Sequence, residues 1–366
     1  MLREKTGIGP GLMFCLVFSS VFGFGVMNAP LVAVKYGGSN GYWGVILALA
    51  LAVPVIAATV YVGNKFPNKS VIEYLPAVFG KVVGKTLGFV FLVFVLVISA
   101  FATRLIGELF SEYFLPRTPL WAILLLVGLT AVFVAHKGVE GISRVAAFIF
   151  PVAVFFIFLS VIISFQGFAF DRVQPLFLID GLKLPYGALQ MFYCFFPMAT
   201  VLAVYPYLTE KNKGFKIVFT ATLLAVVPIF VMVFSAVGIY GYKGVLRYGW
   251  PTLQMTTKAN LPYLLQTFGI FFAVAWYSQI ALATSGLYYA AAQGFSELFG
   301  ALNYKWVLFI VFPLIMVLTL AVPGVIEFRE IFRYIRIAGF GIIFTLPLVV
   351  WLITLITKTG ETRHAS

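Results

Sequence analysis

The chain has 366 residues, of which 62% are hydrophobic and 10% are charged. Soluble domains carry about 25% charged residues, so this composition at this length excludes a soluble domain and indicates a protein with several membrane spans. The formal net charge of +13 does not indicate a nucleic-acid partner. The basic residues are scattered over short loops between apolar runs, as the positive-inside rule leads one to expect.

Apolar runs of about 20 residues predict about ten transmembrane helices. In chain order they cover residues 8–34, 42–63, 85–113, 120–136, 145–165, 185–208, 215–240, 264–295, 306–322 and 331–356. We expect a single transmembrane domain over residues 1–366, with two repeats at about 8–165 and 185–357. An even number of spans places both termini on one side of the membrane, and the distribution of Lys and Arg over the loops favours the cytoplasm.

The first predicted span contains a stretch that interrupts a helix, from Phe22 to Pro30 (FGFGVMNAP). Each glycine costs about 1 kcal/mol relative to alanine, and the proline lacks a backbone donor. In hydrocarbon such an interruption is tolerated only where the freed backbone groups face protein, water or a ligand. We therefore predict a helix broken near mid-membrane, whose exposed backbone forms half of a site for a small zwitterion.

Each side of this break offers different backbone groups. The amides of Gly25, Val26 and Met27 are expected to begin the outer half-helix, where the positive end of the helix dipole attracts a carboxylate. The inner half-helix is expected to end in carbonyl groups that can accept from an ammonium group, those of Phe22, Gly23 and Phe24.

The sixth predicted span has a proline, Pro197, near its centre. A proline at that position frees the carbonyls one turn before it, so those near Tyr193, Cys194 and Phe195 are candidate acceptors for the ligand. A second break five spans after the first is the arrangement of transporters built from inverted repeats. A simple kink is the alternative, because prolines interrupt other spans as well. Phe195 and Phe196 are candidates to pack on the ligand, although such rings can equally fill helix interfaces.

The first span, which reads Gly23-x-Gly25-Val26-x-x-x-Pro30 after Thr6-x-x-x-x-Gly11, resembles the membrane B subunit of bacterial spore nutrient-germinant receptors (GerAB type). That family belongs to the amino acid–polyamine–organocation transporter superfamily. The length, the span count and the short polar C-terminal tail agree with it over essentially the whole chain. The resemblance implies an all-α integral membrane fold with about ten transmembrane helices, a leucine-transporter-type 5+5 inverted repeat with broken helices 1 and 6.

The resemblance also implies a function and partners. The ligand would be an amino acid or another small nutrient, and the chain would work with a larger A subunit and a lipoprotein C subunit in the spore inner membrane. In the fold that this chain resembles, the third and eighth spans complete the pocket. Their candidate ligand contacts are Ser99, Thr103, Tyr277 and Ser278, and a possible ion site would use Thr284 and Ser285. Such hydroxyls can instead bond only to their own helix.

Three charged residues form a column on the third span, at i, i+4 and i+8: Arg104, Glu108 and Glu112. A charge inside a span is a functional candidate, and we expect Arg104 to pair with Glu108 as either an outer gate or a structural clip. Glu108 is also the one carboxylate placed deeply enough to carry a proton. Some proton-coupled relatives use a lysine in the fifth span, and residues 145–165 contain none.

Two functions remain open. One is a nutrient sensor that signals germination to partner subunits, and the other is an ion- or proton-coupled amino-acid transporter. An enzyme is not indicated, because the sequence shows no Ser/His/Asp set and no phosphate-binding loop. Cys15 and Cys194 lie in apolar runs, where cysteine behaves as a small hydrophobe. No disulfide, metal site or cofactor is expected.

Overall fold

The computed structural model describes residues 7–165, 167–177, 181–257, 268–300 and 303–357. Within these ranges the regular structure is helical, apart from one isolated parallel bridge between Ile8 and Leu208. The predicted all-α membrane fold is therefore confirmed. Cys15 and Cys194 are both buried and free.

Ten helical segments lie at the positions of the ten predicted spans. They are α1 (Pro10–Gly25) with α2 (Ala29–Gly37), α3 (Tyr42–Lys65), α5 (Lys81–Tyr113), α6 (Leu120–His136), α7 (Gly138–Ser164), α8 (Lys183–Met191) with α9 (Met198–Val204), α10 (Gly214–Val245), α12 (Phe268–Phe299), α13 (Tyr304–Leu320), and α14 (Val325–Gly339) with α15 (Leu346–Thr357). By length and composition, six of the described helices can cross a membrane, or up to eight spans if each bent pair counts as one. The shorter apolar helices α6 and α13 have 17 residues each, a rise of about 25 Å.

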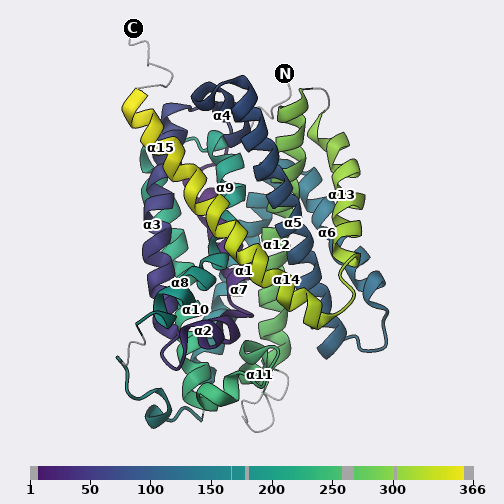
Figure 1. Ribbon diagram of the computed structural model, residues 1–366. Helices are drawn as coiled ribbons and strands as arrows, with labels where there is room; N and C mark the ends of the chain where they lie inside the picture. The colour runs from purple at the N-terminus through teal and green to yellow at the C-terminus, as the bar shows by residue number, and fades with distance from the viewer. Residues whose placement is uncertain (1–6, 166, 178–180, 258–267, 301–302, 358–366) are drawn as a thin grey trace.

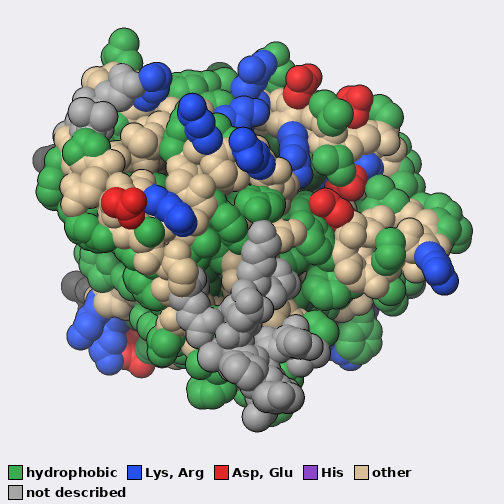
Figure 2. Space-filling model, turned by 90° about the horizontal axis from the view of Figure 1, so that it is seen from below, with side chains coloured by type: hydrophobic (Ala, Val, Ile, Leu, Met, Phe, Trp, Pro, Cys, Tyr) green, Lys and Arg blue, Asp and Glu red, His purple; other side chains and the backbone are tan. Residues whose placement is uncertain are grey.

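The bundle has two distinct ends (Figure 1). Helix α4 (Val71–Phe79) lies across the end where both chain termini are marked, while α2 and α11 (Pro251–Thr257) lie at the opposite end. Lys and Arg side chains gather over part of that opposite end (Figure 2). The last described helix, α15, ends on the side where α4 lies.

The last span begins earlier than predicted, at Val325 rather than residue 331, and crosses the bundle diagonally (Figure 1). The stretch that precedes the apolar run is charged, so hydropathy assigned it to a loop. It is nevertheless helical because one face is buried: Phe328, Phe332 and Arg336, at i, i+4 and i+8, are each at most 5% exposed. A π-helical segment, Phe340–Thr345, joins this helix to α15.

Helix α1 lies in the middle of the bundle and packs against α7, α10 and α12. Its approach to α12 depends on Gly23, because a Cβ atom there would lie 2.5 Å from the backbone of Gln279 and Ile280. Such a distance is shorter than any van der Waals contact, so only glycine permits this approach. The break in the first span is thereby held against the eighth span.

Candidate functional site

The first span is broken, as predicted. Helix α1 ends at Gly25, α2 begins at Ala29, and their axes bend by 60°. Pro30 stands in the first turn of α2, where its missing N–H is harmless and its fixed φ favours a new helix start. Residues 26–28 connect the two half-helices.

The sixth span is broken as well. The segment Lys183–Phe195 and the segment Met198–Tyr207 bend by 44° relative to each other. A 3₁₀ turn, Phe192–Phe195, ends the first segment, and Pro197 stands at the N-cap of the second. A bend of this size with a change of helix type is a break rather than a simple kink.

Three side chains from other elements bind the carbonyl groups of the first break. The indole of Trp276 on α12 donates to the Gly23 carbonyl at 2.8 Å. Tyr193, in the second break, donates its hydroxyl hydrogen to the Gly25 carbonyl at 2.7 Å. Thr252 on α11 donates to the Val26 carbonyl at 2.9 Å. The polar backbone that a membrane interior would penalise is thus satisfied by protein, and the two breaks touch directly.

The outer half-helix begins later than the sequence suggested. The amide of Val26 donates to the Phe22 carbonyl at 3.1 Å, so neither group is free, and Gly25 is still helical. Helix α1 continues through both glycines because they fit close contacts with neighbouring elements: Gly23 with α12, and Gly25 with Cys194 and Ile229. The first turn of the outer half-helix carries the amides of Ala29 and Leu31, not those of Gly25, Val26 and Met27.

Aromatic rings surround the two breaks. Phe24 lies 6.2 Å from Tyr193 and 6.5 Å from Phe196, measured between ring centroids. All three are predicted site residues, so the fold brings these parts of the first and sixth spans together. Phe195 packs instead on Phe192 at 5.5 Å.

A second aromatic group, which we call the aromatic lid, consists of Phe101 on α5 with Phe328 and Phe332 on α14. Phe101 stacks on Phe332 at 3.7 Å and on Phe328 at 4.6 Å. The lid adjoins the breaks, because Phe332 lies 5.3 Å from Tyr193 and Phe101 lies 5.9 Å from Phe24. Its rings connect the first, third, sixth and tenth spans.

The predicted hydroxyl residues bond mainly to their own helices. Hydroxyl groups donate to the carbonyl four residues earlier at Ser99, Thr103, Thr284 and Ser285, and three residues earlier at Ser278. Thr103 alone among them also reaches another helix, at 2.9 Å from the Tyr288 hydroxyl. These contacts agree with the alternative interpretation, in which such hydroxyl groups bond to backbone carbonyls of their own helix. The ion site remains a prediction.

Tyr277 does not lie at the breaks. Its ring packs on Phe110 at 5.3 Å, and it lines an apolar cavity of about 650 Å³ between α5, α6 and α12. Trp276, one residue earlier, faces Gly23 instead. Because successive residues of a helix point about 100° apart, the sequence pointed to the neighbour of the residue that reaches the break.

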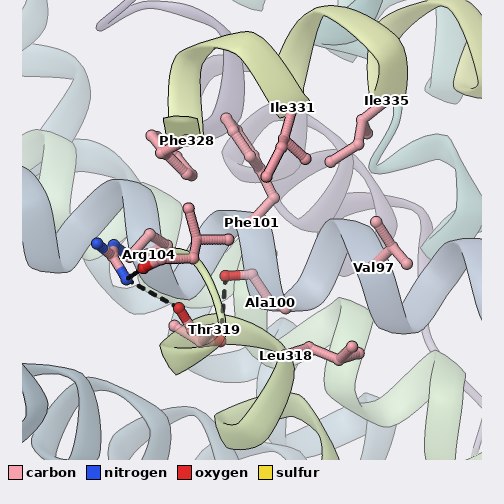
Figure 3. A pocket seen from close by; sticks show the side chains of 10 residues that line it. Val97, Ala100, Phe101, Arg104, Leu318, Thr319, Phe328, Ile331 and Ile335 are labelled. Atoms are coloured by element: carbon pink, nitrogen blue, oxygen red, sulfur yellow. Dashed lines mark hydrogen bonds between the residues drawn. The ribbon is translucent and has the colours of Figure 1, made fainter. Parts of the chain in front are cut away.

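The charge column of α5 is tightly bonded. Arg104 Nε lies 2.5 Å from Glu108 Oε1, which confirms the predicted pair, and Arg104 Nη1 donates to the carbonyls of Thr319 and Val322 at 2.9 Å each. Figure 3 shows this guanidinium beside Thr319, at a cavity of about 210 Å³ between α5, α13 and α14. Glu112 accepts from the Trp250 indole at 2.7 Å. The pair therefore joins α5 to the end of α13, as a structural clip would.

A helical membrane bundle with two discontinuous helices that meet in its middle defines a protein of the transporter-like class. The solved structure of MhsT in complex with L-phenylalanine has this fold, with a TM-score of 0.77 over 96% of this chain and 90% of that one. The identity is 15%, so this likeness shows the fold alone.

The sequence comparisons are more specific. The chain belongs to the spore germination protein family, whose sequence model matches residues 8–324. It is similar to spore germination protein B2 of Bacillus subtilis (strain 168), at 21% identity over 94% of each chain. It is also similar to YndE of the same strain, at 24% identity over 78% of this chain and 79% of that one, and to GerQB of Bacillus cereus, at 21% identity over 94% and 95%. The resemblance to germinant receptor B subunits is confirmed.

Several residues that the structure brings to the breaks carry little signal in the sequence. Trp276 lies in a chain that is 17% aromatic, so nothing marked this indole as a partner for a backbone carbonyl. Thr252 follows Trp250 and Pro251, which opens α11, and only the fold places that short helix against Val26.

Proposed function

We propose that this chain is the transporter-like membrane subunit of a spore germinant receptor, which binds a small nutrient, an amino acid, between the two breaks. The hydrogen bond from Tyr193 to the Gly25 carbonyl carries the proposal most directly. It joins the two places where a transmembrane helix is interrupted, and both residues are buried.

The chemistry of the breaks fits a zwitterion. Carbonyl groups at the end of α1 are acceptors for an ammonium group, while the start of α2 carries the positive end of a helix dipole and suits a carboxylate. Phe24, Cys194 and Phe196 supply apolar surface beside them. These are the complementary groups that an amino acid requires.

The proposed signalling follows from the hydrogen bonds that the carbonyl groups of the first break accept in this structure. An ammonium group that bonds to the carbonyls of Gly23, Gly25 or Val26 competes with Trp276, Tyr193 or Thr252. Those side chains belong to α12, the second break and α11. Binding therefore changes the contacts of three elements at once, and a ligand that favours the released arrangement shifts the population toward it.

The partners and location are part of the same proposal. The curated relatives carry the names of spore germination proteins, which supports a role in germination. A complex with A and C subunits in the spore inner membrane is what the resemblance to germinant receptor B subunits implies. Cytoplasmic termini are proposed from the loop distribution of Lys and Arg along the sequence, although basic side chains also gather over part of the opposite end (Figure 2).

An ion- or proton-coupled amino-acid transporter is the second candidate, because paired broken helices are typical of secondary transporters, and the MhsT structure of the same fold holds L-phenylalanine. The candidate coupling groups are Glu108, which is buried beside Arg104, and the hydroxyls of Thr284 and Ser285. The same pocket serves both functions, so the pocket does not separate them.

Two measurements test these proposals. A thermal-shift screen of the purified chain against the standard amino acids is expected to show saturable stabilisation by one or a few of them. No stabilisation by any would contradict nutrient binding. The stabilising amino acid is then offered, radiolabelled, to liposomes that hold the chain under a sodium or proton gradient. The sensor proposal predicts no uptake above that of empty liposomes, whereas gradient-driven accumulation would establish the transporter.

A further inference from the structure

A small cavity lies between α2 and α14, next to the first break. Its volume is about 50 Å³, and its lining includes Asn28 at the N-cap of α2 and the indole-bearing Trp250. Three cationic residues line it, Lys35, Arg329 and Arg336, and no Asp or Glu does. We call it the α2–α14 cavity. A space bordered by three cations and no acid attracts anions.

Arg336 is the deepest of these cations, at 3% exposed. Its Nε donates to the Gln190 side-chain oxygen at 2.5 Å, and its Nη2 donates to the Tyr36 hydroxyl at 3.0 Å. Its guanidinium carbon lies 4.5 Å from the Phe332 ring centroid and 5.0 Å from that of Tyr36. Among the residues that the structure describes, it forms no ion pair with a carboxylate and no bond through Nη1.

Arg104 shows what a compensated arginine looks like in the same bundle. It is equally buried, but it has the carboxylate of Glu108 and two backbone carbonyls as partners. Arg336 has a neutral amide, a phenol and two ring faces. Contacts with aromatic faces recover only part of the hydration free energy that a charge loses on burial. An anion beside Arg336 would compensate for the rest.

Gln190 adds a second unmet donor beside it. The residue is fully buried, and its Nε2 has no hydrogen-bond partner among the described residues while its Oε1 accepts from Arg336. Buried polar atoms without a partner are rare in folded proteins and call for an explanation, such as a water or an ion.

We propose that the α2–α14 cavity is a binding site for a small monovalent anion, with Arg336 as its principal ligand. The volume accommodates a few water-sized groups, hence a carboxylate or a chloride ion but not a large side chain. The anion is either the carboxylate of the nutrient or a free ion. Only the first of these sources rests on the proposed nutrient-binding function.

The position of Arg336 gives the site a consequence for the fold. Through Tyr36 it bonds to α2, the outer half of the first broken span, and through Gln190 to α8, the first half of the other. Phe332 of the aromatic lid is four residues before it on the same face of α14. An anion that draws the guanidinium toward the cavity competes with both links, so its arrival is transmitted to both broken spans and to the lid.

The test uses the full chain, purified in a buffer whose sole anion is a bulky sulfonate that exceeds the cavity. Its melting temperature is measured against acetate, chloride, the nutrient amino acid and the amide of that amino acid. Variants Arg336→Gln and Lys35→Gln are compared with Arg333→Gln, because Arg333 is exposed on the same helix and does not line the cavity. We expect acetate or chloride to stabilise the wild type and Arg333→Gln saturably.

Arg336→Gln is expected to weaken that anion's affinity by about tenfold or more, since charge-assisted hydrogen bonds are the strong ones. Lys35 is exposed, so Lys35→Gln should fold even if Arg336→Gln does not, with an affinity lowered by about twofold to fivefold through its charge alone. A carboxylate source predicts that the amino acid binds, that its amide does not, and that acetate competes. A free-ion source predicts saturable stabilisation by chloride and unchanged amino-acid affinity in the variants.

The inference is overturned if neither anion stabilises the wild type, or if both variants retain the affinity of Arg333→Gln. Because amino-acid binding to the wild type is measured in the same series, failure of the anion site is distinguishable from failure of nutrient binding. Stabilisation by an anion without any amino-acid binding would support this site and contradict the proposed function.

Discussion

The buried indole of Trp276 donates a hydrogen bond to the carbonyl oxygen of Gly23 across 2.8 Å. Gly23 is also the residue whose missing Cβ allows α1 to approach the backbone of α12. The eighth span therefore both positions the broken first span and satisfies part of its backbone. The site depends on this contact more than on any hydroxyl of the eighth span.

Removing the indole donor should weaken the break. We expect Trp276→Phe to lower the stability of the purified chain by roughly 1–3 kcal/mol, because the substitution leaves a buried carbonyl without its donor. Its affinity for the stabilising amino acid should change as well. Trp306→Phe is the matched control, since Trp306 is 67% exposed and its loss should leave both melting temperature and affinity unchanged.

Gly23→Ala tests the close approach of α1 and α12. The added methyl group would lie 2.5 Å from backbone atoms that cannot move aside, so we expect a large loss of folded protein in the membrane. Gly11→Ala in the same helix meets nothing within 4 Å and should be neutral or stabilising by up to about 1 kcal/mol. Equal accumulation and equal melting temperatures for the two variants would contradict this account of the contact.

Gly25→Leu should separate ligand binding from folding. A Cβ atom there meets side-chain atoms rather than backbone: the end of Ile229 at 2.9 Å, and the Sγ and Cβ of Cys194 at 3.0 and 3.1 Å. We therefore expect the variant to insert and fold once these side chains shift, with its branched side chain displacing Cys194 of the second break and abolishing the nutrient-induced thermal shift. Gly11→Leu is the control, and a normal thermal shift in Gly25→Leu would place the ligand elsewhere.

The Arg104–Glu108 pair can be tested by a double-mutant cycle. Arg104→Ala leaves Glu108 buried without its cation, which we expect to cost roughly 3–5 kcal/mol. Adding Glu108→Ala should restore part of that loss. Recovery should be incomplete, because the carbonyls of Thr319 and Val322 still lack their donor.

The exposed pair of Glu140 and Arg144 provides the comparison. It has the same i, i+4 spacing and the same N–O distance of 2.5 Å, but the arginine side chain is 71% exposed. Arg144→Ala should cost less than about 1 kcal/mol. Similar losses for the two arginines would show that burial does not set the strength of the α5 pair.

The sequence predicted the architecture well because the signals were strong. Apolar runs located ten segments, and the glycines and prolines around Gly25 and Pro197 located both breaks. The boundaries at the breaks were less accurate, because α1 continues through Gly25 where tertiary contacts support it. Local propensity cannot register such support.

The side chains that serve the site were harder to predict. Ser99 and Ser278 had polar groups at suitable depth, yet both bond to their own helices. Trp276 and Thr252, which do reach the break, come from elements whose rotation and position only the folded bundle sets. Arg336 lies inside the predicted last span, residues 331–356, and the buried residues at i−4 and i−8, Phe332 and Phe328, show that it lies on a buried face.

The central claim is that a small nutrient lies between the two breaks. The most direct test is an experimental structure of the purified chain with the amino acid that gives the largest thermal shift. We expect ligand density within hydrogen-bonding distance of the backbone between Gly23 and Met27, with the Tyr193 or Trp276 bond to that backbone displaced. Density for the amino acid only elsewhere, such as in the α5–α6–α12 cavity beside Tyr277, with both of those bonds intact, would contradict it.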